Sequence, residues 1–281
     1  MTPQAARLGR RGSLGVGRTR VPLGPFYGAM LALLYLPIAI LFVFSFNAGT
    51  ALSFPIEGLT LDWYGEVLDN GAMLDAARNS LVVGVGSATL ATALGSMVAV
   101  AVLRFRFRGR SLLLALAGLP LIVPFVVMGV AFFLLFVAVD VPRSLFTVGI
   151  GHSIIAVPYA TLIVLARLSG LDPALEDAAM DLGATYPSTL RRVVLPLMGQ
   201  TLLSAWLTCF IVSFDEIALA IFLVGGDPTF PVFLYGQLRF AQRLPVLIAM
   251  AVLLMVGTVA LTLIAMRLRQ ARWAERSPYR L

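Results

Sequence analysis

The stretch LDPALEDAAMDLGATYPSTLRRVVLPLMGQ occupies residues 171–200 and separates two long apolar runs. It begins with Asp172, whose side chain can cap a helix, followed by Pro173, which fits the first helical position. Gly183 is suited to end the helix, because glycine readily adopts the conformation found at helix C-termini. The stretch therefore predicts a helix of about three turns over residues 173–182, within a loop that joins two apolar runs.

The two faces of this predicted helix differ in chemistry. One stripe at helical spacing is apolar and partly small, and consists of Leu175, Ala178, Ala179 and Leu182. Glu176 and Asp177 lie in the first turn, where the helix dipole favours acidic groups. A helix resting on lipid would instead carry bulky apolar residues and basic flanks. The pattern therefore favours docking into a groove on another protein over an interfacial helix on the lipid.

The second half of the stretch leads back into apolar sequence. Pro187 is expected to start another short helix, which carries Arg191 and Arg192. Leu195 and Pro196 then precede an apolar run that begins near residue 200. The loop is thus long and structured, whereas most connections between the apolar runs are short.

Composition identifies lipid as the main solvent of the chain. Of its 281 residues, 59% are hydrophobic and only 12% are charged, and the mean hydropathy is +0.94. Soluble domains are about a quarter charged. At about 20 residues for each span, the length accommodates five to seven spanning helices. It leaves no room for a soluble catalytic domain.

The predicted fold is an all-α polytopic membrane protein with six transmembrane helices. The predicted spans cover residues 26–46, 80–103, 112–139, 147–168, 200–224 and 244–266, with kinks at Pro120 and Pro124 in the third. Residues 1–25 are expected to form a disordered tail and residues 268–281 a second tail. The membrane domain then covers residues 26–267 and includes the loop 171–199.

The basic residues are distributed unequally between the two sides of this six-span arrangement. The two tails and the loops at 104–111 and 167–199 hold 17 of the 21 basic residues, all of them arginine. Cytoplasmic loops of membrane proteins carry an excess of basic residues. We therefore expect both ends of the chain to lie in the cytoplasm, with the loop 171–199 on the same side.

Several functions are excluded or disfavoured by the residues present. The net charge of +7 would suggest nucleic acid in a soluble protein, but here the arginines flank apolar runs, so no nucleic-acid partner is expected. The chain has no lysine and therefore cannot supply the lysine of a phosphate-binding loop. The single Cys209 permits neither an intrachain disulfide nor a cysteine metal cluster. The single His152 is expected to be an interfacial histidine rather than a ligand.

Two acidic residues, Asp215 and Glu216, fall inside the predicted fifth span. An ionised carboxylate in that position costs about 2.5 kcal/mol or more on insertion scales. On a helix the two would point about 100° apart, so one can face a pathway and the other a neighbouring helix. A purely structural role is the alternative. Trp206 and Phe210, at i and i+4 before them, are expected to pack in the core or, as the second reading, to form part of a cation-binding cage.

Two segments outside the spans are also predicted to be structured. Asp62, before Trp63, is expected to cap a short interfacial helix. After the break at 225–228, residues 230–240 are expected to form an external re-entrant or interfacial helix, with a plain connecting loop as an equal alternative.

The stretch 171–200 resembles the EAA loop of permease subunits in binding-protein-dependent ABC importers. In that family the loop carries Glu-Ala-Ala, three residues, Gly, nine residues, Ile, one residue and Leu-Pro. The matching positions here, at the same spacing, are Asp177, Ala178, Ala179, Gly183, Val193, Leu195 and Pro196. Two of them depart from the pattern, with Asp in place of Glu and Val in place of Ile. Both replacements keep the chemistry of the position.

The resemblance extends over the six-span core and implies the architecture of a type I ABC importer permease. It implies that the loop is the coupling helix, which fits a cleft of the ATPase subunit. The residues implied in ATPase coupling are Glu176, Asp177, Ala178, Ala179, Gly183, Leu195 and Pro196. The implied partners are a second permease subunit, expected to be a different chain, two cytoplasmic ATPase subunits and a periplasmic solute-binding protein. No cofactor is expected on this chain, since ATP and Mg²⁺ would be bound by the ATPase subunits.

Within that family the chain looks like the second permease of the spermidine/putrescine type. This likeness rests on the segments Leu61-Asp62-Trp63-Tyr64, Arg78-Asn79-Ser80, Arg106-Phe107-Arg108-Gly109 and Ser213-Phe214-Asp215-Glu216. It implies a cationic polyamine as the solute. The substrate pathway would then include Asp215, Glu216, Trp206 and Phe210, because an acidic pathway favours cations.

Three alternatives are weighed against this reading. A permease for another small organic solute would share the same motifs. A secondary transporter working alone would need coupling acids in several spans or broken helices in matched halves, and the sequence shows one acidic site and no convincing internal repeat. A membrane-embedded enzyme would need clustered His, Cys or acidic residues inside the spans, and only the pair Asp215 and Glu216 is available.

Overall fold

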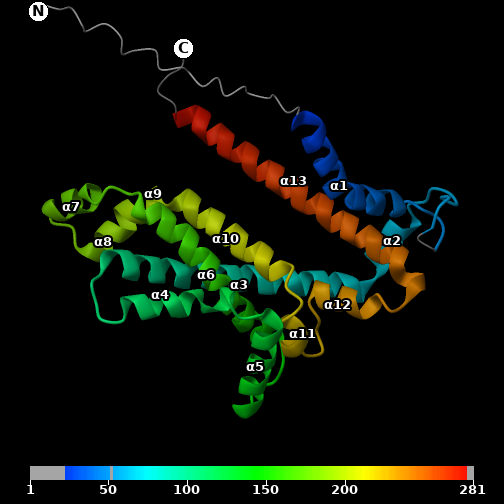
Figure 1. Ribbon diagram of the computed structural model, residues 1–281, viewed down its shortest axis with the longest axis horizontal. Helices are drawn as coiled ribbons and strands as arrows, with labels where there is room; N and C mark the ends of the chain where they lie inside the picture. The colour runs from blue at the N-terminus through cyan, green and yellow to red at the C-terminus, as the bar shows by residue number, and fades with distance from the viewer. Residues whose placement is uncertain (1–22, 51–52, 277–281) are drawn as a thin grey trace, which may run out of the picture.

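The computed structural model describes residues 23–50 and 53–276, and the side chains of residues 24–50 and 53–260. In this part of the chain the regular structure is helical, apart from one isolated antiparallel bridge between Asn47 and Leu59 (Figure 1). The predicted all-α fold is confirmed. Most of the predicted N-terminal tail, residues 1–22, lies outside the described residues, as do residues 277–281.

Four helices are long and apolar enough to cross a bilayer on their own. They are α1 (Leu23–Phe44), α3 (Gly71–Arg104), α6 (Leu145–Ser169) and α13 (Leu244–Arg276). Two further pairs of helical segments reach the same length and hydropathy together but are sharply bent. If each bent pair is one span, the described residues contain six spans, which is the number predicted from the sequence.

The first bent pair replaces the third predicted span. It consists of α4 (Arg110–Gly118), the 3₁₀ turn η1 (Leu119–Leu121) and α5 (Phe125–Ala138), with a bend of 107°. Pro120 lies within η1 and Pro124 directly precedes α5. Because proline removes a backbone donor and clashes with the preceding turn, two prolines four residues apart can end a helix rather than merely kink it. The span predicted over 112–139 is thus bent at the two prolines that were predicted as kinks, and the bend is sharp enough to divide it into separate helices.

The second bent pair begins at Tyr186, within the loop singled out in the sequence. After α7 (Ala174–Asp181) come α8 (Tyr186–Thr189), the π-helical turn η2 (Leu190–Val194) and α9 (Leu195–Leu197). A bend of 74° then leads into α10 (Gly199–Phe214). The remaining elements are α2 (Asp62–Asp69), α11 (Ala220–Leu223), α12 (Phe230–Gln237) and the 3₁₀ turn η3 (Ala241–Arg243).

The core of the molecule is formed by α3, α6 and α10, which pack on one another through small residues. At Gly95 of α3, an added Cβ would lie 2.6 Å from Cβ of Ala160 and 2.8 Å from the backbone nitrogen of Thr161. Such close backbone approach is what small residues permit between helices in a membrane. The buried alanines at this junction are Ala88, Ala91, Ala99, Ala156, Ala160 and Ala205.

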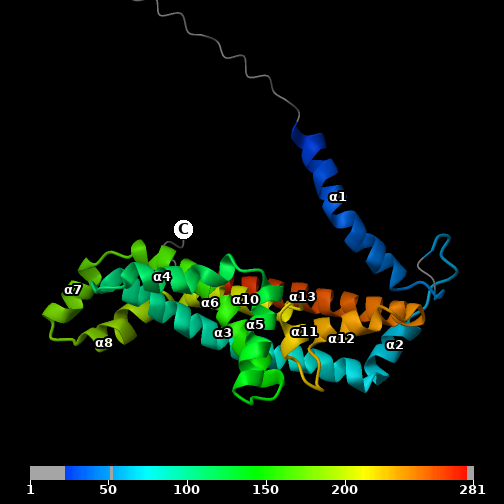
Figure 2. The same cartoon turned by 60° about the horizontal axis from the view of Figure 1, so that its bottom comes forward.

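The elongated molecule places its two sets of loops at opposite ends. Helices α7 and α8 lie at one end, beside the connection from α3 to α4, whereas α2 and α12 lie at the other end in both views (Figures 1 and 2). The formation of α12 agrees with the helical alternative for residues 230–240. Asp62, predicted as a helix cap, is instead the first residue of α2, and its own N–H donates to Oγ1 of Thr60 at 3.1 Å.

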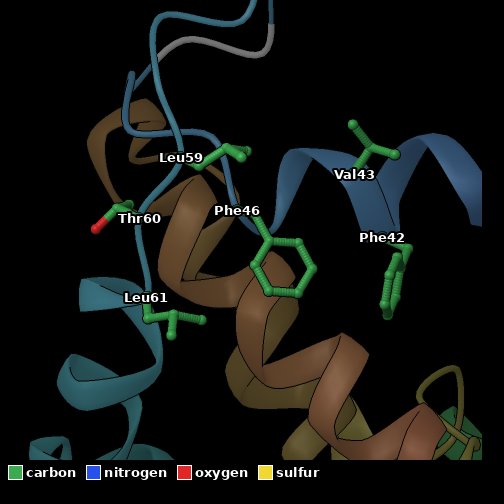
Figure 3. A pocket seen from close by; sticks show the side chains of 6 residues that line it. All are labelled: Phe42, Val43, Phe46, Leu59, Thr60 and Leu61. Carbon is green, nitrogen blue, oxygen red and sulfur yellow. The ribbon is translucent and has the colours of Figure 1, made fainter.

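Helix α1 projects away from the rest of the molecule (Figure 2), and none of its most apolar window is buried. Where α1 ends, an apolar cavity of about 770 Å³ opens between the helix and the chain that follows it (Figure 3). The cavity is lined by Phe42, Val43, Phe46, Leu59, Thr60 and Leu61. At the other terminus, α13 continues past the predicted end of its span at Met266 to Arg276.

Candidate functional site

Helix α7 (Ala174–Asp181) forms where the sequence predicted a helix over 173–182. Oδ1 of Asp172 accepts a hydrogen bond from the N–H of Ala174 at 3.0 Å, so the predicted side-chain cap is present. Gly183 has φ of +87°, the left-handed conformation that ends many helices and that residues with a Cβ adopt at a cost. Both ends of the helix are thus fixed by the residues that predicted them.

One face of α7 is exposed at the tip of the molecule (Figure 1). Leu182 is 91% exposed and Leu175 is 47% exposed. Asp177 and Ala178 are exposed between them, whereas Ala179 is half-buried. The exposed face therefore combines apolar and acidic groups, as a surface that contacts another protein often does.

The opposite face of α7 is attached to the chain's own spans. Glu176 is buried, and its Oε1 lies 2.8 Å from both Nε and a terminal nitrogen of Arg104. Arg104 also donates to the carbonyl oxygen of Leu168 in the last turn of α6, at 3.3 Å. Glu176 and Asp177, adjacent in sequence and predicted together, thus face in different directions.

A pair of aromatic rings packs beside this ion pair. The rings of Phe105 and Tyr186 meet edge to face, with centroids 5.3 Å apart. Burial raises the pKa of the Tyr186 phenol, the Glu176 carboxylate raises it further, and the Arg104 guanidinium acts in the opposite direction. The first residues of α8 are therefore held next to the end of α3.

The predicted residues Leu195 and Pro196 lie in α9 and are exposed, whereas Val194 and Met198 on either side of them are buried in the core. The short segments η2 and α9 thus anchor one face of the loop. Their other face stays accessible near the exposed face of α7.

The fifth predicted span is broken at its acidic residues, and the prediction of a continuous helix over 200–224 was wrong. Helix α10 ends at Phe214, and Asp215 and Glu216 lie in a non-helical segment before α11. Oε1 of Glu216 accepts the N–H of Leu219 at 2.8 Å, so this carboxylate caps the turn that leads into α11. Asp215 is exposed, and within the described part of the chain no hydrogen bond or ion pair engages its carboxylate.

Three aromatic side chains follow one another along one side of α10, and Asp215 comes directly after the last of them in the sequence. Trp206 and Phe210 are stacked, with centroids 5.5 Å apart and ring planes 12° apart, and Phe214 follows Phe210 at 5.7 Å. Nε1 of Trp206 donates to Oγ1 of Thr89 at 3.0 Å, which fixes the orientation of the indole. Phe214 was not predicted as a site residue, although its spacing of four residues from Phe210 would have indicated it.

A buried polar chain crosses the three-helix core in the last turn of α10. Oγ of Ser213 lies 2.7 Å from Oγ of Ser87 and 2.8 Å from Nδ1 of His152. The prediction of an interfacial histidine was wrong, because His152 is completely buried in α6. Its hydrogen-bond partner is the hydroxyl of Ser213. Among the described residues, no three His, Cys, Asp or Glu side chains are grouped as a metal ion would require.

Comparison with known proteins adds to this geometry. Residues 91–273 match the family model of the binding-protein-dependent transport system inner membrane component. The matched range includes α7, the broken span at 215–219 and most of the core. It covers more than half of the chain.

Two curated relatives from Escherichia coli strain K12 are similar along most of their length. The chain is 32% identical to the spermidine/putrescine transport system permease protein PotC over 238 residues, which covers 84% of this chain and 89% of PotC. It is 34% identical to the putrescine transport system permease protein PotI over 230 residues, which covers 79% of this chain and 81% of PotI.

The fold also matches a solved structure. A chain from the crystal structure of a bacterial ABC transporter involved in the import of the acidic polysaccharide alginate superposes with a TM-score of 0.68. The match covers 86% of this chain and 93% of that one, at 17% sequence identity, and shows the shared fold. Together, the family match and the two relatives show that this chain is a member of the family of inner membrane components of binding-protein-dependent transport systems.

Proposed function

We propose that this chain is the permease subunit through which a polyamine, such as putrescine or spermidine, crosses the inner membrane. The observation that carries the proposal is the exposed Asp215 carboxylate at the end of an aromatic column, in a chain whose relatives are named for these two solutes. Because α10 ends at Phe214, Asp215 lies in a non-helical segment in which its carboxylate is exposed.

The chemistry of the column suits a flexible organic cation. Aromatic faces attract ammonium groups, by about 0.5–2 kcal/mol depending on desolvation. A polyamine carries several ammonium groups along an apolar chain, so the stacked rings of Trp206 and Phe210 can contact its methylenes and charges in turn. Asp215 supplies the complementary charge. Glu216 has a different role in this proposal, since its carboxylate is already engaged by the backbone of α11.

The energy for transport is proposed to come from partner subunits. The exposed face of α7 docks into a cleft of an ATPase subunit, with Ala178 and Ala179 at the closest approach. ATP and Mg²⁺ are bound and ATP is hydrolysed there, and this chain performs no catalysis and holds no cofactor. Asp177, Gly183, Leu195 and Pro196 shape the same contact, in line with their accessible positions around α7.

The complete transporter is proposed to contain this chain, a second and different permease, two ATPase subunits and a periplasmic binding protein. The unburied apolar surface of α1 supports a position against lipid and the second permease. Both termini and α7 face the cytoplasm. This orientation rests on the arginines at the α7 end of the molecule, which include the exposed Arg106, Arg108, Arg191 and Arg192.

The proposal is tested by uptake of radiolabelled putrescine and spermidine by the complete transporter in proteoliposomes. We expect Asp215→Asn to lower uptake about tenfold, which corresponds to the loss of about 1.4 kcal/mol of interaction with the solute, while the subunits still assemble. Asp69→Asn, which removes an exposed carboxylate at the end of α2, is the matched control and should leave uptake unchanged. Normal uptake by Asp215→Asn, or no polyamine uptake by the wild type, contradicts the proposal.

A further inference from the structure

The ion pair between Arg104 and Glu176 joins three elements at the end of the molecule that carries α7. Arg104 is the last residue of α3, Glu176 lies in the first turn of α7, and the carbonyl oxygen of Leu168 belongs to the last turn of α6. The side chains of Arg104 and Glu176 are only 15% and 8% exposed. The guanidinium of Arg104, at the end of α3, thus binds both α7 and the last turn of α6.

This pair differs from the other charges around it. Arg106, Arg108, Asp177 and Asp181 are all exposed, and an exposed pair would contribute little because water screens it. Among the residues whose side chains the structure describes, Arg104 and Glu176 form the only ion pair within 4 Å. Removing one member of a buried pair leaves the other charge buried and uncompensated, which strongly disfavours the attached arrangement.

The ion pair is a direct connection of α7 to the spans. The main packing partners of α7 are α8 and η2, which belong to the same loop. The contact of Phe105 with Tyr186 holds α8 beside the end of α3 and so supports the same attachment. Arg104 therefore adds a side-chain link from α7 to α3 and α6 beside the connection that the loop itself provides.

We propose that Arg104 and Glu176 are positioning residues that make α7 move as one body with α3 and α6. Glu176 then acts through its own chain and makes no contact with the ATPase, whereas Asp177, on the exposed side, does. When a solute-loaded binding protein shifts the spans, the ion pair carries that shift to α7 and so to the ATPase. This inference rests on the proposed docking of α7.

The test uses the complete transporter with its binding protein and compares Arg104→Gln and Glu176→Gln with Arg106→Gln. Arg106→Gln is the matched control, because it makes the same change at an exposed position two residues away. The measurements are the ATPase retained on the purified permease, the basal ATP hydrolysis, and the stimulation of hydrolysis by the binding protein. A fourth variant exchanges the charges, with Arg104→Glu and Glu176→Arg together.

We expect the two single variants to retain the ATPase and basal hydrolysis but to lose stimulation about tenfold, within the usual range of coupling between sites. A further variant combines Arg104→Gln with Glu176→Gln. Its stimulation of hydrolysis should be no lower than that of either single variant, since the same interaction is lost in each case. The charge-exchanged pair should recover part of the stimulation. A purely structural role would lower the yield of permease in the membrane without this specific pattern.

Three outcomes overturn the proposal. The first is stimulation in both single variants equal to that of Arg106→Gln. The second is release of the ATPase by Glu176→Gln alone, which would place Glu176 in the contact with the partner. The third outcome concerns the case in which the single variants lower the yield of permease. The proposal then fails if the charge-exchanged pair recovers the yield but not the stimulation of hydrolysis. Ala179→Trp, measured in the same assays, distinguishes failure of the ion-pair proposal from failure of the proposed docking of α7. If it disturbs the ATPase while Arg104→Gln behaves normally, only the ion-pair proposal fails, whereas wild-type behaviour of Ala179→Trp refutes the docking of α7 and the ion-pair proposal with it.

Discussion

Replacing Gly183 by valine should weaken the attachment of the ATPase through the backbone alone. Gly183 has φ of +87°, and a Cβ built at this position meets no heavy atom within 4 Å. Steric space is therefore available within this chain. The cost comes from the left-handed conformation, which is about 1–2 kcal/mol for a residue with a Cβ and is particularly unfavourable for a β-branched one.

This cost sets the size of the expected effect. A penalty of 1–2 kcal/mol shifts an equilibrium by a factor of about 5–30. The equilibrium here lies between the turned loop, in which α8 folds back beside α7, and arrangements without that turn. We therefore expect Gly183→Val to lower ATPase retention and putrescine uptake by a factor in that range, with normal amounts of permease in the membrane. Asparagine tolerates the left-handed region far better than valine, so Gly183→Asn should stay close to wild type.

The assay is the amount of ATPase that co-purifies with tagged permease, together with putrescine uptake by the same preparations. Two results would refute the reasoning. Wild-type behaviour of Gly183→Val would mean that the turned conformation does not limit coupling. An equal loss in Gly183→Asn and Gly183→Val would mean that side-chain bulk at the partner surface, and not φ, is what the position excludes.

The remaining predictions concern docking, core packing and orientation. Ala179→Trp should release the ATPase or uncouple it, because overpacking a close contact costs about 1–3 kcal/mol; unchanged co-purification would contradict this. Gly95→Val should greatly reduce folded permease, since its Cβ would lie 2.8 Å from a backbone nitrogen of α6, while Gly86→Val, with nothing within 4 Å, should be tolerated. Equal yields of the two would count against the packing argument. Reporter fusions should show the periplasm after Asp140 and the cytoplasm at Arg269, and a cytoplasmic signal after Asp140 would disprove the six-span orientation.

The features that the sequence predicted correctly depend on local rules. Asp172 and Gly183 each act on the backbone within two or three residues of themselves, so their effect on α7 can be derived without the rest of the fold. The long apolar runs likewise predict α1, α3, α6 and α13, because the hydrocarbon core imposes length and hydropathy on any spanning helix. Whether the exposed side of α7 docks into an ATPase stays a prediction.

The features that were missed depend on partners far away in the sequence. Hydropathy could not reveal the end of α10 at Phe214, because the turn after it contains Leu219, which packs against Gly129 and Gly151 of two other helices. His152 is buried in α6, and the hydrogen bond of its Nδ1 is made with Ser213, 61 residues later. The ion pair of Glu176 with Arg104 joins residues 72 positions apart. Spacing alone could not distinguish Glu176 from its exposed neighbour Asp177.

The polar chain through Ser87, His152 and Ser213 also constrains how the protein is made. The chain is synthesised from its N-terminus, and Ser213 follows Ser87 by 126 positions. Until the ribosome has released residue 213, the imidazole of His152 lacks its Ser213 partner, whereas the hydroxyl of Ser87 already donates to the carbonyl oxygen of Val83 within α3. Polar side chains left without such a group in hydrocarbon are costly. We therefore expect α6 to stay beside the insertion machinery or water until α10 has been made, and an arrest of translation before residue 213 to leave His152 without this partner.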